Sequence, residues 1–468
     1  KQQLVELRRL IFGSKSERFI ASDIDRSQLA LFESDTAKQE ASQQEQITYS
    51  RKKPKEKQPP VRALLPAHLP RVEEVIEPKS LDNHAVKIGE LITEVLEYNP
   101  AKIFVRKIVR PKYAIKGQNK ITVAELPSLP LPKANAGASL LAHILVSKYV
   151  DHLPFYRQRQ IFKRQKVNVS DSTLSGWFNA TSSLLEPLYG CLENNILQSN
   201  YLQADESPIG VQDNHKKGSL HTGYHWVYHA PVEGLVLFKY DKSRSLKAPQ
   251  EFLQEFSGTL QTDGYKVYQN LQLKGNLKLL SCMAHARRYF EKALDNDVSR
   301  ANYALLQIQV LYNLERKIKE KEADKAVVER YRKTYAIPVL ERLHAWMKEQ
   351  YIKVLPKSAI GKAIAYSLRL WDKLAAYIED GNYHIDNNLI ENTIRPLALG
   401  RKNYLFAGSH KAAQKAAMMY SFFATCKMNQ IEPYTWLEDV LQRIPEHKAN
   451  RLTELLPQNW KNIEITNG

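Results

Sequence analysis

The sequence predicts a multidomain α/β protein whose largest domain is built on a mixed β-sheet. The chain has 468 residues, which is too long for a single hydrophobic core. Three strand-like segments follow one another between residues 201 and 241, and further strands then alternate with helical segments. Residues 296–380 are helical in pattern throughout and interrupt this order. We therefore expect an all-helical insertion inside an α/β core.

The first 133 residues divide into three segments of different composition. Residues 1–20 open with leucines at heptad-like spacing, which indicates the end of a coiled-coil helix, although an ordinary surface helix gives the same pattern. Residues 21–60 are polar and end in a basic run, as expected of a solvated linker whose cations could also contact phosphates. Residues 61–133 show strand-like alternation and predict a small β-rich domain.

Residues 134–198 predict a helical domain with two helices joined by a short turn. The first helix covers residues 156–165, and Ser170 is a good N-cap for the second. This spacing matches a helix-turn-helix that reads DNA, although any tight helical corner looks similar. Three hydroxyl side chains would then reach base edges: Ser172, Thr173 and Ser175. Four cations would favour phosphates: Arg157, Arg159, Lys163 and Arg164.

Residues 199–295 predict the first part of the sheet. The segments from residue 201, 224–230 and 234–241 are rich in aromatic and β-branched residues, and a hairpin-length turn between the last two favours antiparallel pairing. A helix (245–256), a strand (258–262), a short helix and a strand (277–283) follow. A further helix is expected to begin at Ala284.

Two carboxylates in this part of the chain are candidate metal ligands. Asp205 lies on the first strand, at or near its end, and Asp263 follows the fourth strand. If these strands are neighbours, the carboxylates meet and raise each other's pKa. A divalent cation relieves that repulsion, and oxygen ligands suit Mg²⁺. Glu206 would point to the opposite face of the strand, and Asp263 alone could be an ordinary turn residue.

Residues 381–427 predict the second part of the core, and residues 428–468 a helical tail. On a helical wheel, Glu391 and Arg395 lie opposite the apolar arc that contains Ile390. Asp386 is a plausible N-cap, and Pro396 is expected to end or kink the helix at Arg395. By itself, Glu391 could be only an i,i+4 partner of Arg395.

Four motifs in this layout closely resemble the transposases of the insertion-sequence sixty-six family. They are ADES (204–207), TDGY (262–265), CMAHARRYF (282–290) and DNNLIENTIRPLALGRKNYLFAGS (386–409). The resemblance covers nearly the whole chain, and the last motif is the most specific. It implies a ribonuclease-H-like core with an Asp-Asp-Glu triad. The candidate triad is Asp205, Asp263 and Glu391.

In an enzyme of this kind the triad holds two Mg²⁺ ions, for which Mn²⁺ substitutes, on both sides of the scissile phosphate. The implied reaction is cleavage at the terminal inverted repeats, followed by attack of the freed 3′-OH on target DNA. The implied partners are these DNAs, further copies of the chain as a homodimer or higher oligomer, and small companion proteins of the same element. Two other interpretations remain open: a metal-dependent nuclease without strand transfer, and a DNA-binding regulator with an inactive core.

Six further residues are candidates for contact with DNA beside the triad: His285, Arg287, Arg288, Arg395, Arg401 and Lys402. For His285, a capping or packing role at the junction of strand and helix is the alternative. Solvation of the loop is the alternative for Arg401 and Lys402.

Charge and cysteine usage limit the other functional classes. A formal net charge of +18 favours a polyanionic partner, although solvated lysines also produce such a balance. The three cysteines are isolated, and the regions where relatives place zinc-binding pairs (79–84 and 114–118) contain none, so a zinc site is unsupported. Without a membrane-length apolar run or a signal peptide, we expect a cytoplasmic, nucleoid-associated protein without a membrane partner.

Overall fold

The computed structural model describes residues 136–213, 219–271 and 275–461, with short pieces before them (103, 112–114, 121–123, 128–131 and 134). The predicted coiled-coil end, the linker and most of the β-rich segment lie outside the described residues. Within that segment, β1 (Lys112–Ala114) and β2 (Ile121–Val123) pair antiparallel.

A mixed sheet forms the centre of the described chain. Its strands are β3 (Tyr201–Gln212), β4 (Leu220–Ala230), β5 (Leu235–Asp241), β6 (Gly258–Thr262), β7 (Leu277–Ser281) and β8 (Phe406–Ala407). The order is β5-β4-β3-β6-β7, and β8 also pairs with β3. Strands β3, β4 and β5 are antiparallel, whereas β6 and β7 run parallel to β3. The predicted antiparallel series is therefore confirmed, and the first and fourth strands, whose adjacency the sequence left as a possibility, are neighbours.

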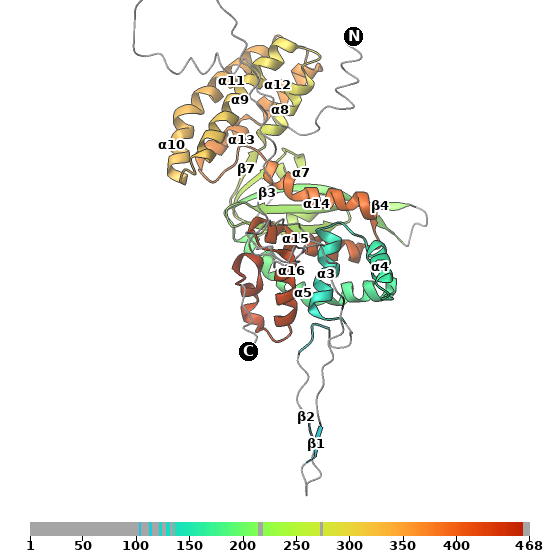
Figure 1. The fold of residues 1–468 in the computed structure, drawn as a ribbon. Helices are drawn as coiled ribbons and strands as arrows, with labels where there is room; N and C mark the ends of the chain where they lie inside the picture. The colour runs from blue at the N-terminus through green and yellow to red at the C-terminus, as the bar shows by residue number, and fades with distance from the viewer. Residues whose placement is uncertain are drawn as a thin grey trace, which may run out of the picture. The chain divides into compact units, whose positions relative to one another are not determined.

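Strand β3 is longer than its partner on one side. On this side it pairs with β6 only over Tyr201–Gln203 and with β8 only at Gly210 and Val211. Residues 204–209 therefore have no strand partner on this side among the described residues, and we call this the split edge of β3. Helix α14 (Asn388–Tyr404) crosses this split edge (Figure 1). The Asn387 amide donates to the Ala204 carbonyl at 3.4 Å, and Arg401 donates to the Pro208 carbonyl.

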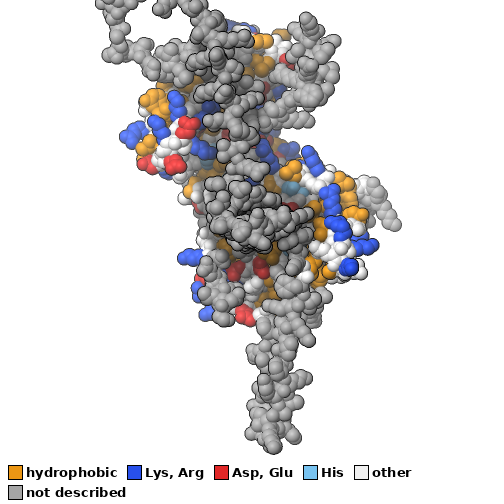
Figure 2. All heavy atoms as spheres, in the orientation of Figure 1, with side chains coloured by type: hydrophobic (Ala, Val, Ile, Leu, Met, Phe, Trp, Pro, Cys, Tyr) orange, Lys and Arg blue, Asp and Glu red, His pale blue; other side chains and the backbone are white. Residues whose placement is uncertain are grey.

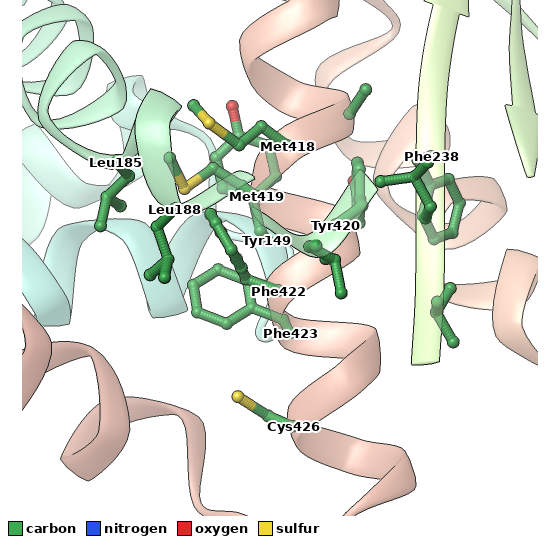
Figure 3. Close-up of a cluster of buried hydrophobic side chains, with 14 of the residues drawn as sticks. Tyr149, Leu185, Leu188, Phe238, Met418, Met419, Tyr420, Phe422, Phe423 and Cys426 are labelled. Atoms are coloured by element: carbon green, nitrogen blue, oxygen red, sulfur yellow. The ribbon is translucent and has the colours of Figure 1, made fainter. Parts of the chain in front are cut away.

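Helix α15 (His410–Met428) packs on β5. Figure 3 shows its Met, Phe and Tyr side chains between Leu185 and Leu188 of α5 and Phe238 of β5. The hydroxyls of Ser421 and Thr425 accept backbone N–H bonds from β5 at 2.8 and 3.2 Å. Because β5 is an edge strand, these bonds satisfy donors that would otherwise be open to another strand.

Other helices pack around the sheet. They are α3 (Ala138–Tyr149), α4 (Phe155–Arg164), α5 (Asp171–Leu197), α6 (Lys247–Phe252), α7 (Lys266–Gln269) and α16 (Pro433–Arg443), with the 3₁₀ turns η3 (Ala449–Leu455) and η4 (Pro457–Asn459). Ser170 caps α5 as predicted, because its hydroxyl accepts the N–H of Thr173 at 3.0 Å.

The predicted helical insertion has a hydrophobic core separate from that of the sheet. Its elements are α9 (Val298–Glu320), α10 (Lys325–Tyr335), α11 (Ile337–Tyr351), α12 (Ala359–Arg369), α13 (Trp371–Ala375) and η2 (Ala376–Glu379), and they pack with α8 (Met283–Lys292). Figure 1 shows these helices gathered together in yellow and orange. Their return segment leads directly into α14.

Four local expectations differ from the structure. Asp205 lies inside β3, not at its end, because β3 continues to Gln212 along β4. Helix α6 ends at Phe252, four residues before the predicted end, because the apolar residues that follow are buried in a turn. The N-cap of α14 is Asn387, although Asp386 does accept the N–H of Asn388 at 3.0 Å.

The fourth difference is at Pro396, which neither ends α14 nor stops it at Arg395. A proline in a helix leaves the carbonyl four residues earlier without its usual N–H partner. Here that residue is Asn392, which is exposed, so water can bond to its carbonyl. The proline is therefore tolerated on the solvent side of the helix.

Candidate active site

Asp205 is placed by the long pairing of β3 with β4, opposite Val227. Its Oδ1 accepts the backbone N–H of Glu206 at 2.8 Å. The pKa of Asp205 is raised to about 7, first by burial and then by the charges of Glu206, Asp263 and Glu391 in that order. Carboxylates from three separate parts of the chain therefore act on one buried acid.

Asp263 lies in a tight turn directly after β6. Its Oδ1 accepts the N–H of Tyr265 at 2.7 Å, and its carbonyl accepts the hydroxyl of Tyr366 on α12 at 2.7 Å. Gly264 has a φ of +86°, and a Cβ there would lie 2.7 Å from Cδ1 of Leu370. The Asp-Gly pair is thus a turn, as its sequence indicates, but one fixed against the insertion.

Glu391 lies in the first turn of α14 and faces α8. Arg288 donates from Nη2 to both of its carboxylate oxygens, at 2.8 and 3.1 Å. Nε2 of His285 lies 3.9 Å from Glu391 Oε1 and 3.1 Å from Arg288 Nη1. The CMAHARRYF and DNNLIENTIRP motifs therefore meet at this carboxylate.

The three carboxylates offer only oxygen donors, which fit a hard divalent cation such as Mg²⁺. The raised pKa of Asp205 also reflects an excess of negative charge that a cation would neutralise. Within the part of the chain that the structure describes, however, no three His, Cys, Asp or Glu side chains are arranged to hold one ion. Arg288 supplies the positive charge at Glu391 instead.

Glu206 was assigned away from the site by strand alternation, and its contacts do lie toward β4 and α7. Arg244 pairs with its carboxylate, which also accepts the hydroxyl of Tyr268 at 3.1 Å. The side chain is only 2% exposed. Nevertheless, its charge makes the largest electrostatic contribution to the raised pKa of Asp205. Alternation separates side chains by face, but it does not remove the interaction between neighbouring charges.

The predicted DNA-contacting cations of α4 and α14 lie on one flank. Figure 2 shows a row of Lys and Arg side chains over these helices. The exposed ones are Arg157, Lys163, Arg164, Arg395 and Lys402. Arg157 also donates to the Asn403 side chain at 3.0 Å, which joins the two helices.

The remaining candidates have protein partners. Arg159 pairs with Asp171, Arg287 donates to Glu291 at 2.6 Å, and Arg401 donates to the Pro208 carbonyl. Ser172 and Ser175 are exposed at the start of α5, and the hydroxyls of Ser172 and Thr173 lie 2.7 and 2.8 Å from that of the capping Ser170. The structure therefore gathers the predicted cations around two places, the α4–α14 flank and the carboxylates.

Residues 133–415 match the family model described as "Transposase IS66 family". The chain belongs to the IS66 transposase family. The resemblance seen in the sequence motifs is thereby confirmed. Two further segments of this IS66-family chain match family models: residues 421–458 match the IS66 C-terminal element, and residues 1–73 match the segment described as "Transposase C of IS166 homeodomain".

Relatives of this IS66-family chain extend over almost its full length. The uncharacterized protein y4jD of Sinorhizobium fredii (strain NBRC 101917 / NGR234) is 32% identical over 490 residues, covering 99% of this chain and 95% of that protein. The uncharacterized proteins y4hP and y4qI of the same strain are 30% and 33% identical and cover 98% and 97% of this chain. Among the described residues, no helix has both the length and the apolar character needed to cross a bilayer.

Proposed function

We propose that this IS66-family transposase cleaves DNA at the terminal inverted repeats of an insertion sequence and joins the freed ends to target DNA. Asp205, Asp263 and Glu391 form its catalytic triad on a ribonuclease-H-like core. The observation that carries this proposal is the match of residues 133–415 to the IS66 transposase family, a range that includes all three acids. In support, the charges of Asp263 and Glu391 both act on Asp205 in the fold, although the three acids come from different parts of the sequence. The antiparallel series β3-β4-β5, followed by parallel β6 and β7, supports the core assignment.

The carboxylates of the triad hold and orient divalent cations, Mg²⁺ or Mn²⁺, at the scissile phosphate. When bound, such ions activate a water for in-line attack and stabilise the leaving 3′ oxygen. Before that, Arg288 must release at least one oxygen of Glu391, because both are bonded to it. A DNA phosphate is a suitable new partner for the guanidinium, since it accepts bidentate hydrogen bonds in the same way as a carboxylate.

Helices α4 and α5 act as the helix-turn-helix that reads the repeat. Ser172 and Ser175 are exposed on the first turn of α5, where a recognition helix contacts bases. The cations of α4 and α14 bind phosphates. The hydrogen bond from Arg157 to Asn403 links the two helices and so fixes the position of the α4 cations relative to those of α14. DNA bound at α4 would therefore continue along α14 toward Glu391.

The test uses labelled DNA that carries the inverted repeats flanking the gene. Specific nicking at the repeat boundary with Mg²⁺, absent with EDTA and with Asp263→Asn, is the expected result, and strand transfer to a target plasmid should follow. Nicking without transfer would favour a nuclease. Tight binding without nicking would favour a DNA-binding regulator.

A further inference from the structure

Three polar side chains form a buried hydrogen-bonded cluster beneath the carboxylates. Gln203 of β3 and Gln261 of β6 are fully buried, and Tyr201 is nearly so. Gln203 Nε2 lies 2.9 Å from Gln261 Oε1 and 3.2 Å from the Tyr201 hydroxyl, and that hydroxyl also donates to Gln261 Oε1. The cluster therefore links neighbouring strands through their side chains as well as through the backbone.

The same side chains hold the segment that returns from the insertion. Gln261 Nε2 donates to the His384 carbonyl at 2.7 Å, and Gln203 Nε2 donates to the Asp386 carbonyl at 3.1 Å. The N–H of His384 donates to the Tyr201 hydroxyl at 3.2 Å. Residues 384–386 are thus fixed across β3 and β6 by three side-chain contacts.

Each segment held in this way leads to one acid of the triad. Gln203 lies two residues before Asp205, and Gln261 lies two residues before Asp263. Asp386 lies just before α14, whose first turn carries Glu391. One cluster therefore sets the relative positions of the three chain segments that carry the carboxylates.

We propose that Gln203 and Gln261 are positioning residues of the transposase reaction. They fix the start of α14 on β3 and β6, and thereby place Glu391 relative to Asp205 and Asp263. This inference rests on the triad assignment of the proposed function. The two amides act through the backbone of residues 384–386 and do not touch substrate.

A positioning role depends on specific hydrogen bonds to the return segment, whereas a packing role depends only on side-chain volume. Replacing one buried amide by an apolar side chain leaves its carbonyl partner unpaired and destabilises the protein in either role, so a loss of stability alone does not identify a positioning residue. What is lost is the directed bond that sets the register of the return segment. A methionine at either position keeps the volume and removes that bond.

The test compares Gln203→Met and Gln261→Met with Gln309→Met. Gln309 is also a buried glutamine, but its amide bonds Asn313 within α9 of the insertion. For each variant, hydrogen exchange of residues 383–391, thermal unfolding, and Mn²⁺ binding by electron paramagnetic resonance with repeat-end DNA would be measured.

We expect faster exchange in residues 383–391 and about 10-fold weaker Mn²⁺ binding for the two cluster variants, as when residues supporting metal ligands are lost. Gln309→Met should match the wild type in both. Unchanged exchange or unchanged Mn²⁺ affinity in the cluster variants would overturn the positioning role. If the cluster variants show these changes but the wild type never cleaves DNA, the proposed function is refuted, and the role of the cluster in placing the three carboxylates stands.

Discussion

Arg288 and Glu391 form a bidentate ion pair between α8 and α14, with N–O distances of 2.8 and 3.1 Å. The pair joins the helix that follows β7 to the helix that follows the insertion. Both side chains are about one-third exposed, so water and ions can reach them. The guanidinium occupies the oxygens that the proposed cation would need, and it therefore competes with that cation.

Replacing Arg288 by glutamine should strengthen Mn²⁺ binding to the DNA-free protein several-fold, because Glu391 loses its competing partner. The loss of a partly exposed ion pair should cost about 1 kcal/mol of stability or less. Electron paramagnetic resonance and thermal unfolding measure the two effects. Arg287→Gln, one residue away and paired with Glu291, is the matched control. Unchanged or weaker Mn²⁺ binding in Arg288→Gln would show that the pair does not compete with metal.

Asp205 should make the metal-free protein less stable as the pH rises. Its pKa of about 7 in the folded protein exceeds the ordinary value of 3.8, so the folded state binds the proton more tightly than the unfolded state. That contribution is complete below pH 3.8 and is lost as the pH rises through 7. Asp205→Asn should therefore be more stable than the wild type at pH 8 by a few kcal/mol, on the order of the pKa difference.

Thermal unfolding at pH 5 and pH 8 without divalent ions tests this expectation. The advantage of Asp205→Asn should shrink at pH 5 and should also shrink when Mn²⁺ is added to the wild type. An equal stability difference at both pH values would mean that Asp205 is not a strained carboxylate.

His225 should limit stability on the acid side. It is fully buried, neither ring nitrogen has a hydrogen-bond partner among the described residues, and burial lowers its pKa to about 3. The unfolded state takes up a proton near pH 6.5, whereas the folded state does not, so stability is lost as the pH falls below 6.5. At pH 5 the loss should be about 2 kcal/mol.

His225→Phe should remove that part of the pH dependence, as measured by urea unfolding at pH 7 and pH 5. His143→Phe, which alters an exposed histidine, is the control. A wild-type-like loss between the two pH values in His225→Phe would assign the acid sensitivity to other groups.

Exposed cations of α4 should bind phosphates and not bases. Lys163→Ala should weaken binding to repeat and unrelated DNA equally, and should reduce the slope of log K against log salt by about 1. Ser175→Ala should weaken binding to the repeat more than to unrelated DNA, because base contacts carry specificity. Lys357→Ala, on the exposed surface of the insertion, should change neither slope nor specificity. Equal effects of Lys163→Ala and Lys357→Ala would argue against DNA contact at α4.

Much of the sheet could be predicted because its signals are local. Aromatic and β-branched runs with a hairpin-length turn fix β4 and β5, and Ser170 marks the start of α5. The adjacency of β3 and β6 followed from the order of the elements. The strand runs, the hairpin turn and the N-cap depend on residues close together in the sequence, whereas the pairing of β3 with β6 joins residues far apart in it.

The contacts around the carboxylates could not be predicted in the same way. The pairing of Arg288 with Glu391 and the bond from Gln203 to the Asp386 carbonyl join residues that only the folded insertion brings together. Pro396 was predicted to end or kink α14 at Arg395, but the helix continues to Tyr404. The exposure of Asn392, where water can replace the missing N–H, is a tertiary property that the sequence does not show. The triad itself remains a prediction from motif resemblance.

Because the chain is synthesised from its N-terminus, the split edge of β3 stays open until the last part of the protein has been made. Strand β3 leaves the ribosome well before β8 and α14, which complete its edge beyond β6. Arg401 of α14, for example, follows its partner Pro208 by 193 residues. A nascent or truncated chain that ends within the insertion thus lacks both Glu391 and the segment that closes the edge. Under the proposed function, such an incomplete product would lack one acid of the triad and would not cleave DNA.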